Sequence, residues 1–335
     1  RLAALGHFRV GQLIRDRDRI RANEHFRQAV ALDPEDMNFG YALADSLERS
    51  THGFAGAHLE EAYQLLLKLL ERGPPPAANA PFARRLCIRI GDYARSETFG
   101  SFEALGRAAG RSGHHGAFLQ QISRVRTFED RLELVHQHRI WGELFERLAA
   151  AYPIVHPARR EPDGRIRLGI LSSDLRFHPV AYFAMPLFEH VDRSRFDLYC
   201  YSFYTGPEAD PIQQKITSIV DQFRWAPGLT EREAAQMIAD DQLDILLELG
   251  GPTFMNKPEV CAFKPAPIIV SWLGYPHSAG LATIDYLVTD PFVTPTREGM
   301  LIEQPLPMPR SWISLGSEAF RDTDVIDPRT PEERN

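Results

Sequence analysis

The stretch IRLGIL at residues 166–171, followed by SSDLRFHP at 172–179, decides the fold of this chain. A short, continuous apolar run that ends in a polar loop is typical of a buried strand in a parallel sheet. Pro179 can begin a helix at its first position, because the N–H that proline lacks would have no helical partner there. The stretch therefore predicts a strand, a loop and a helix in succession, which is the start of a βαβ unit.

The same pattern of an apolar run and a Gly/Pro-containing loop occurs twice more. DILLEL at 244–249 precedes GGPT at 250–253, and PIIVSWL at 267–273 precedes GYPHSAG at 274–280. The other expected elements are strands at 196–203 and 284–288 and helices from Pro179 and near 208–220, 230–241 and 256–263. This alternation predicts a parallel sheet with right-handed crossovers. Because ligands bind such sheets beyond the carboxyl ends of the strands, the three loops predict one active site.

Up to about residue 150 the pattern is helical. Ala22 and Phe26 precede Pro34 with the same internal spacing as Ala62 and Leu66 before Pro74, and the two sets lie 40 positions apart, 62 minus 22. This spacing is typical of the second helix of a tetratricopeptide (TPR) unit, although an insertion near residues 50–56 is needed to explain a period above about 34 residues. An irregular helical bundle is the alternative. Either arrangement favours a binding scaffold.

A last amphipathic helix is expected before residue 151, on the helical spacing of Leu134, Trp141, Leu144, Phe145 and Leu148. His136 and His138 lie two positions apart, so they diverge around the axis and form no metal pair. We expect both to be solvated. The resulting division is a TPR-like helical domain at 1–150, a Pro-rich and charged linker at 151–165, an α/β Rossmann-like lobe at 166–316 and a polar connector at 317–335.

Composition narrows the classes of function. With 45 acidic and 38 basic residues, the formal charge of −7 argues against binding to nucleic acid or to an anionic membrane. Three widely spaced cysteines favour neither disulfides nor zinc and fit a cytoplasmic protein. No secretory signal or membrane-length apolar stretch occurs. We expect no metal site, because the strings Asp16–Asp18 and Asp322–Asp324 lie far from the three loops. The absence of a Walker loop and of GxGxxG argues against nucleotide binding by those routes.

His178 is the first candidate for catalysis. Its imidazole is expected on a loop at the carboxyl edge of the sheet, where it can accept a proton or hydrogen-bond a ligand. The alternative is an exposed histidine without a role. Asp174 is expected to orient His178 or a substrate hydroxyl, or else to cap the turn.

The other two loops offer candidates for substrate or donor binding. Glycine lets a ligand approach the backbone closely, and backbone amides and hydroxyls suit the oxygens of sugars and phosphates. Ordinary turn formation is the alternative for each position. The candidates are Gly250, Gly251, Thr253, Gly274, Tyr275, Pro276, Ser278 and Gly280.

These loops resemble the SPINDLY / O-linked N-acetylglucosamine transferase family of TPR-linked protein glycosyltransferases. The resemblance rests on the ordered set Ile166–Gly169 with Ser172–Asp174 and His178–Pro179, Phe263–Pro267, Trp272–Pro276 and Ile284–Asp290. It implies a GT-B fold, of which residues 166–316 are the first Rossmann-like lobe. The chain is then expected to be a piece of a longer protein whose second lobe follows Asn335.

The resemblance also implies an activity. That activity is metal-independent, inverting transfer of a sugar from a nucleotide-sugar donor to Ser or Thr of an acceptor protein that docks on the helical repeats. His178 would act as base or positioner, and the 274–280 loop would shape the sugar side of the cleft. The expected donor is UDP-GlcNAc, as a substrate, with no cofactor and in a bacterial cytoplasm; a homo-oligomer stays open.

Departures from the family pattern keep alternatives open. His277-Ser278-Ala279 stands where the animal enzyme has Gly-Thr-Ser, so fucose, or a nonulosonic acid as in flagellin-modifying enzymes, remains an alternative to N-acetylglucosamine. A non-catalytic TPR protein that only binds partners is the alternative from a different class of function. We expect this piece by itself to be inert, because half of a two-lobe cleft lacks the groups that hold the diphosphate.

Overall fold

The computed structural model describes residues 1–15, 18–50, 55–76, 79–161, 164–206, 208–253 and 255–316. The predicted connector at 317–335 lies outside these residues, as do Asp16, Asp322, Asp324 and most of the expected insertion. The chain divides into two compact units, Arg1–Leu105 and Gly106–Asn335. The boundary between the units, after Leu105, comes earlier in the sequence than the change of pattern near residue 150.

The first unit consists of helices that pack on their neighbours in sequence. Asp18 and Asp36 cap two of these helices, since their carboxylates accept hydrogen bonds from the backbone N–H groups of Arg21 and Asn38. The elements are α1 (Leu2–Ile14), α2 (Arg19–Leu32), α3 (Met37–Glu48), α4 (Ala55–Leu70), α5 (Ala80–Ile90), α6 (Tyr93–Ser96) and the 3₁₀ helix η1 (Glu97–Phe99).

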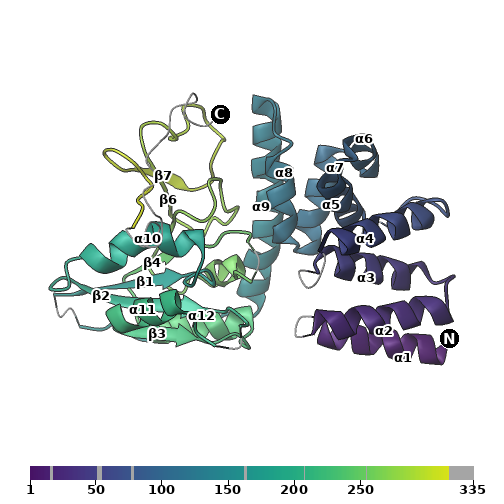
Figure 1. Ribbon diagram of the computed structural model, residues 1–335. Coiled ribbons are helices and arrows are strands. Elements are labelled where there is room, and N and C mark those ends of the chain that lie inside the picture. Colours follow the sequence, from purple (N-terminus) through teal and green to yellow (C-terminus); the bar gives the residue numbers. More distant parts are fainter. Residues whose placement is uncertain are drawn as a thin grey trace, which may run out of the picture. The chain divides into compact units, whose positions relative to one another are not determined.

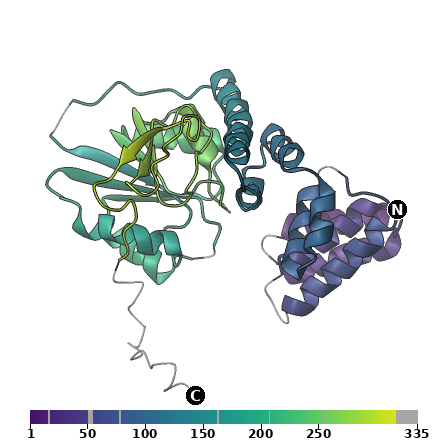
Figure 2. The ribbon, with the colours of Figure 1, turned by 90° about the horizontal axis from the view of Figure 1, so that it is seen from above.

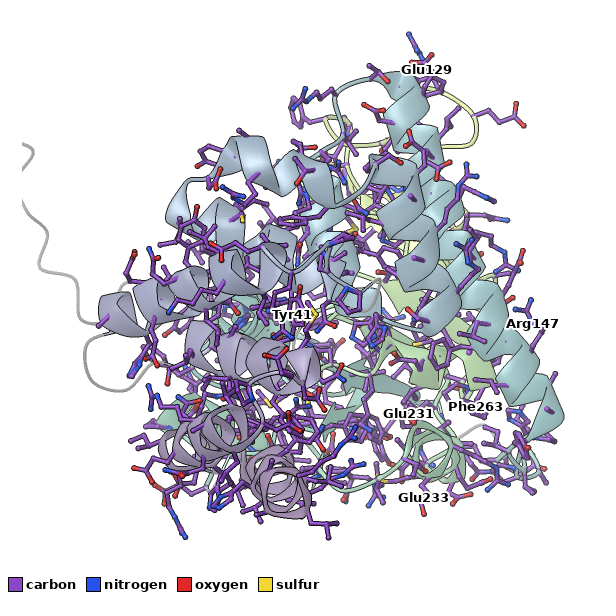
Figure 3. All side chains as sticks on the ribbon, turned by 90° about the vertical axis from the view of Figure 1, so that its right-hand side faces the viewer. Tyr41, Glu129, Arg147, Glu231, Glu233 and Phe263 are labelled. Carbon is purple, nitrogen blue, oxygen red and sulfur yellow. The ribbon has the colours of Figure 1, made fainter. Side chains whose placement is uncertain are left out.

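The core of this unit contains the residues on which the repeat prediction rests. Ala22 and Phe26 on α2, and Ala62 and Leu66 on α4, are buried in one apolar cluster. Tyr41 of α3 belongs to the same cluster (Figure 3). Small and large side chains at these positions let successive helices approach closely. The prediction of a TPR-like helical region is thus confirmed.

The second unit holds a parallel sheet preceded by helices. The helices are α7 (Phe102–Ser112), which starts before the boundary, η2 (His115–Ala117), α8 (Phe118–Ile122) and α9 (Phe128–Ala151). The strands are β1 (Ile166–Leu171), β2 (Phe196–Ser202), β3 (Gln222–Trp225), β4 (Ile245–Glu248), β5 (Ile268–Ser271), β6 (Tyr286–Thr289) and β7 (Gln304–Pro307). Their order is β3-β2-β1-β4-β5-β6-β7 with parallel pairing throughout (Figure 1). The predicted α/β Rossmann-like lobe is confirmed.

Helices cover both faces of the sheet (Figures 1 and 2). Ile170 packs in the cluster of α10 (Pro179–His190) and α11 (Pro211–Ile219), whereas its neighbour Leu171 belongs to the cluster on the opposite face. That opposite cluster includes α12 (Glu231–Asp240), the 3₁₀ helix η3 (Pro258–Phe263) and part of α9. Burial on both faces explains why β1 reads as a nearly continuous apolar run.

Two strands and one helix type differ from the sequence-based expectation. β3 and β7 were not predicted, because neither forms an apolar run. β3 is at most half-buried, and β7 carries two prolines and is exposed along its length. The helix expected near 256–263 is the 3₁₀ helix η3. Prolines at its start and just beyond its end restrict it to a short segment, for which 3₁₀ geometry is common.

α9 is the predicted amphipathic helix and lies within the second unit. Thr127 and Asp130 form a capping box at its start, and Figure 3 shows Glu129 and Arg147 near its opposite ends. His136 is exposed, but His138 is fully buried, so the expectation that His138 is solvated was wrong. His138 lies one helical turn after Leu134 and therefore on the same buried face.

Beyond Ala151, which ends α9, the described part of the predicted linker has no regular secondary structure but is held against α12. The backbone N–H of Val155 donates to Oε1 of Gln236 at 2.8 Å, and the Val155 carbonyl accepts from Nε2 of the same amide at 2.8 Å. Among the helices that the structure describes, none is long and apolar enough to cross a membrane.

Candidate active site

The strand order places a topological switch point between β1 and β4, the position at which open α/β sheets form a crevice. Crossovers leave these two adjacent strands in opposite directions along the sheet, and ligands of open α/β sheets bind beyond the carboxyl ends at such a switch point. The loops that follow Leu171 and Glu248 therefore lie at the place where a ligand is expected. Two of the three predicted loops are these two.

Asp174 is a buried carboxylate in the loop after β1. Its Oδ2 accepts from Nδ2 of Asn256 at 2.8 Å and from the hydroxyl of Thr253 at 3.3 Å. Its Oδ1 accepts from a guanidinium nitrogen of Arg176 at 3.3 Å. With an exposed fraction of 2%, a carboxylate needs such partners to be tolerated. The carboxylate oxygens are thus fixed in direction.

His178 is the N-cap residue of α10, and Pro179 begins that helix as predicted. Its Nδ1 accepts from the backbone N–H of Val180 at 3.2 Å, so in the neutral ring the proton is on Nε2. Nε2 lies 3.8 Å from Oδ1 of Asp174, and 32% of the imidazole side chain is exposed. Burial lowers the pKa of His178, and the Asp174 carboxylate opposes this shift. The accessible group is therefore an N–H donor on a neutral ring.

Glu248 organises the loop after β4. One oxygen of this buried carboxylate accepts from the backbone N–H groups of Gly250 at 2.7 Å and Gly251 at 2.6 Å. Burial raises the pKa of Glu248 to about 7, and the two N–H donors act against that rise. Gly251 has φ +54°, a conformation that glycine adopts without the strain of a side chain.

Asn256 joins the β1 and β4 loops. Its Oδ1 accepts from the backbone N–H of Ser173 at 2.7 Å, while its Nδ2 donates to Asp174. Its side chain packs on Gly250, where an added Cβ would lie 2.1 Å from Cγ of Asn256. Both ends of the amide are used, so a single orientation is fixed.

The loop after β5 is mostly buried. Tyr275 has an exposed fraction of 3%, and Ser278 is fully buried. The Ser278 hydroxyl accepts from the backbone N–H groups of Gly280 at 3.4 Å and Ile302 at 3.3 Å, so it serves the fold rather than an open cleft. Gly274 is half-buried and Pro276 is exposed. A ligand-binding role for this loop stays a prediction.

The structure thus brings Asp174, His178, Gly250, Gly251 and Thr253 into one crevice. Gly274 and Tyr275 lie directly behind Gly250 and Gly251, whereas Gly280 lies against His138 of α9 and Ser278 bonds to Gly280 and Ile302. Sequence reasoning missed Asn256, Glu248 and His138. A charged residue that ends an apolar strand before two glycines was the available signal for Glu248.

A cavity of about 290 Å³ lies at the opposite, amino-terminal edge of the sheet. Leu243, Ala266 and Pro267 are among its apolar lining residues, and Arg159 and Lys264 are among its basic ones. It adjoins the starts of β4 and β5, so it is separate from the crevice. Among the described residues, no group of three or more His, Cys, Asp or Glu could hold a metal ion.

The crevice can hydrogen-bond a hydroxyl-bearing ligand. The half-exposed imidazole of His178 can donate from Nε2–H, beside the Asp174 carboxylate and the Thr253 hydroxyl, which hydrogen-bond each other. These groups come from two loops that Asn256 ties together. Such a convergent set suits the recognition of a polar substrate.

Comparison with known proteins places this arrangement in context. Residues 144–312 match glycosyl transferase family 41. The probable UDP-N-acetylglucosamine–peptide N-acetylglucosaminyltransferase SPINDLY of Arabidopsis thaliana is 33% identical over 165 residues, which are 49% of this chain and 18% of that protein. The UDP-N-acetylglucosamine–peptide N-acetylglucosaminyltransferase of Caenorhabditis elegans is 29% identical over 165 residues, 48% of this chain and 14% of that protein.

A solved structure supports the fold. The K341M mutant of the Thermobaculum terrenum O-GlcNAc transferase matches with a TM-score of 0.70 and 24% identity, over 93% of this chain and 57% of that one. The matched segments thus span under a fifth of the length of these two curated relatives and over half of the solved structure. Because the family match extends over about half of its residues, from the end of α9 to beyond β7, the chain belongs to glycosyl transferase family 41.

Proposed function

We propose that this chain is part of a protein glycosyltransferase that moves a sugar from a nucleotide-sugar donor to a Ser or Thr hydroxyl of an acceptor protein. N-acetylglucosamine from UDP-GlcNAc is the first sugar to test, because the similar proteins carry that activity in their names. The observation that carries the proposal is the site between β1 and β4, where both His178 and Thr253 lie beside the Asp174 carboxylate.

In the proposed reaction the acceptor oxygen bonds to the anomeric carbon as the bond from that carbon to the diphosphate oxygen breaks. The hydroxyl proton passes to a base, and the diphosphate leaves with its charge. Transfer of this kind inverts the anomeric centre and needs no metal when cationic groups and helix N-termini meet the charge of the leaving group. We expect those groups in the second GT-B lobe that the family resemblance implies.

His178 has two conceivable tasks in this reaction, and the hydrogen bonds favour one. The only basic lone pair of the neutral ring is on Nδ1, and it already accepts the N–H of Val180. Acting as a base would require the release of that cap, whereas donation from Nε2–H requires no rearrangement. We therefore assign His178 to orienting the acceptor hydroxyl or a sugar oxygen, with Asp174 directing the ring.

We propose the helical first unit as the docking surface for the acceptor. Repeats of paired helices build extended binding surfaces. Deleting residues 1–105 from the full-length protein should weaken transfer to folded acceptors far more than hydrolysis of the donor, because water needs no docking. This deletion keeps α9, which belongs to the second compact unit. Equal loss of both activities in a folded protein would make the helices structural support only.

The activity is tested by mass spectrometry of acceptor proteins co-expressed with the full-length protein. Parallel incubations with UDP-GlcNAc, GDP-fucose and a CMP-nonulosonic acid identify the sugar from the mass added. Modification with UDP-GlcNAc that His178→Asn strongly reduces supports the proposal. No added mass with any donor, by a protein that is folded, would contradict it.

A non-catalytic binding protein is the second candidate, and the capped lone pair of His178 favours it. Retained acceptor binding with neither transfer nor donor hydrolysis would support this alternative. For either function we propose a cytoplasmic protein, since Cys87, Cys200 and Cys261 are all free and buried.

A further inference from the structure

A buried histidine of α9 contacts the active-site side of the sheet through a single tyrosine. Nδ1 of His138 lies 2.7 Å from the carbonyl of Leu134, an oxygen that can only accept, so the proton is on Nδ1. Nε2 must then accept, and it receives the hydroxyl of Tyr275 at 2.8 Å. Both nitrogens are used, and burial lowers the pKa of His138 to about 3, so the ring is neutral at ordinary pH.

Tyr275 packs directly on the glycines of the β4 loop. A Cβ placed on Gly251 would lie 2.4 Å from Cβ of Tyr275, and one on Gly274 would lie 1.6 Å from the carbonyl oxygen of Leu249. Backbone and side chain are therefore in contact without space for a single methyl group. Any shift of the Tyr275 ring must displace Gly251 or open a gap.

The contact continues from the glycines to the crevice. Asn256 packs on Gly250 and donates to Asp174 at 2.8 Å. The Asp174 carboxylate in turn lies 3.8 Å from Nε2 of His178. An unbroken series of contacts thus leads from His138 through Tyr275, the two glycines and Asn256 to the proposed reacting groups.

Further contacts fix the position of α9 against the loop after β5, so His138 itself is held in place. Gly142 lies one turn beyond His138, and a Cβ there would be 1.8 Å from the carbonyl oxygen of Gly280. Glu146 accepts from the backbone N–H of Ala282 at 2.7 Å. Phe118 stacks on the other side of His138 with ring centroids 4.0 Å apart.

We propose that His138 is a positioning residue of the candidate active site, which acts through the Tyr275 hydroxyl to hold the Gly250–Asn256 loop against Asp174. The expected effect of His138 on turnover rests on the proposed function. Its expected effect on the loop does not depend on that function. Small displacements of reacting groups reduce rates by large factors, so a loss of one hydrogen bond can matter at a distance.

The test compares four variants of the full-length protein. Tyr275→Phe removes only the hydroxyl, and His138→Leu removes the acceptor while it fills the space with an apolar side chain. His138→Gln keeps one donor and one acceptor. His136→Ala is the matched control, because His136 is exposed on the same helix two positions earlier.

Two measurements are made on each variant. We expect Tyr275→Phe and His138→Leu to lower kcat roughly 10- to 100-fold with little change in the KM for the donor, because groups are misplaced rather than removed. Backbone amides of 250–256 should exchange hydrogen for deuterium faster. His138→Gln should recover much of both, and His136→Ala should match the wild type. A fifth protein, which combines Tyr275→Phe with His138→Leu, should be no worse than the worse of these two single variants, since both substitutions break one interaction.

Unchanged exchange at 250–256 in folded His138→Leu and Tyr275→Phe would overturn the proposal. Equal rises in KM and falls in kcat, without recovery by His138→Gln, would also overturn it. If the wild type transfers no sugar, the proposed function fails, but the exchange measurement still decides whether His138 holds the loop.

Discussion

The loops after β1 and β4 differ from the loop after β5, although all three look alike in sequence. Each follows an apolar strand and contains polar residues with Gly or Pro. In the first two, side chains of Asp174, His178 and Thr253 converge on the crevice. In the third, Ser278 is fully buried and Tyr275 nearly so, and both bond to other parts of the fold.

The difference follows from strand order. β1 and β4 are adjacent at the switch point, so their loops border the crevice directly. β5 lies one strand further along and its loop is covered by α9, whose Gly142 allows close contact with Gly280. One pair of loops therefore exposes chemical groups, and the other loop supports them. Three predictions test this division.

The largest effect is expected at His178, on the crevice side. His178→Asn in the full-length protein should reduce transfer by about 10²-fold, because the Nε2–H that orients the acceptor hydroxyl or a sugar oxygen is lost. Asparagine is a good N-cap residue, so the free energy of unfolding should stay close to that of the wild type. His178→Ala is the comparison, with the same loss of transfer and an additional loss of about 1 kcal/mol of stability in denaturant unfolding. Wild-type turnover in His178→Asn would remove this residue from the site.

The next effect is on stability, in the supporting loop. Gly280 has φ +87°, and a Cβ there would lie 2.3 Å from the carbonyl oxygen of His138. Gly280→Ala should therefore lower the free energy of unfolding by roughly 2–4 kcal/mol. Gly164 is the matched control, with φ +82° but no heavy atom within 4 Å. Gly164→Ala should cost only about 1 kcal/mol. Equal losses in urea unfolding would show that close packing on α9 is unimportant.

The smallest effect concerns Glu248, which holds the β4 loop. Its folded-state pKa of about 7 exceeds that of an unfolded Glu, about 4.3. Between these pH values the folded state retains a proton that the unfolded state releases, so the stability contributed by this group falls as pH rises toward 7 and is then constant. Glu248→Gln cannot titrate. Its stability relative to the wild type should rise by roughly 2 kcal/mol from pH 5 to pH 8. A difference that does not vary with pH would contradict the raised pKa.

Much of the fold follows from local pattern. The strand at 166–171, the helix from Pro179 and the helical spacing of Ala22 and Phe26 were all predictable, because apolar period and proline position act over short distances. β7 was not, since it holds one apolar residue, Leu306, between two prolines, and only pairing with β6 defines it.

The candidate site was predictable only in part. Strand ends indicated where Asp174 and His178 lie, because carboxyl ends of parallel strands share an edge. The contact between His138 and Tyr275 depends on how α9 packs, because the two residues are 137 positions apart in sequence. The burial of Ser278 depends in part on Ile302, whose backbone N–H donates to it. The cap that His178 provides to α10 was also missed, although Pro179 after it was a local sign of a helix start.

We expect the crevice beyond β1 and β4 to bind the donor or the acceptor. Hydrogen–deuterium exchange of the full-length protein, with and without UDP-GlcNAc and acceptor, measures this binding. Residues 172–179 and 250–256 should gain protection, and residues 156–160, by the cavity on the opposite edge, should gain none. Protection confined to 156–160 and 264–267, with none at 172–179, would contradict it.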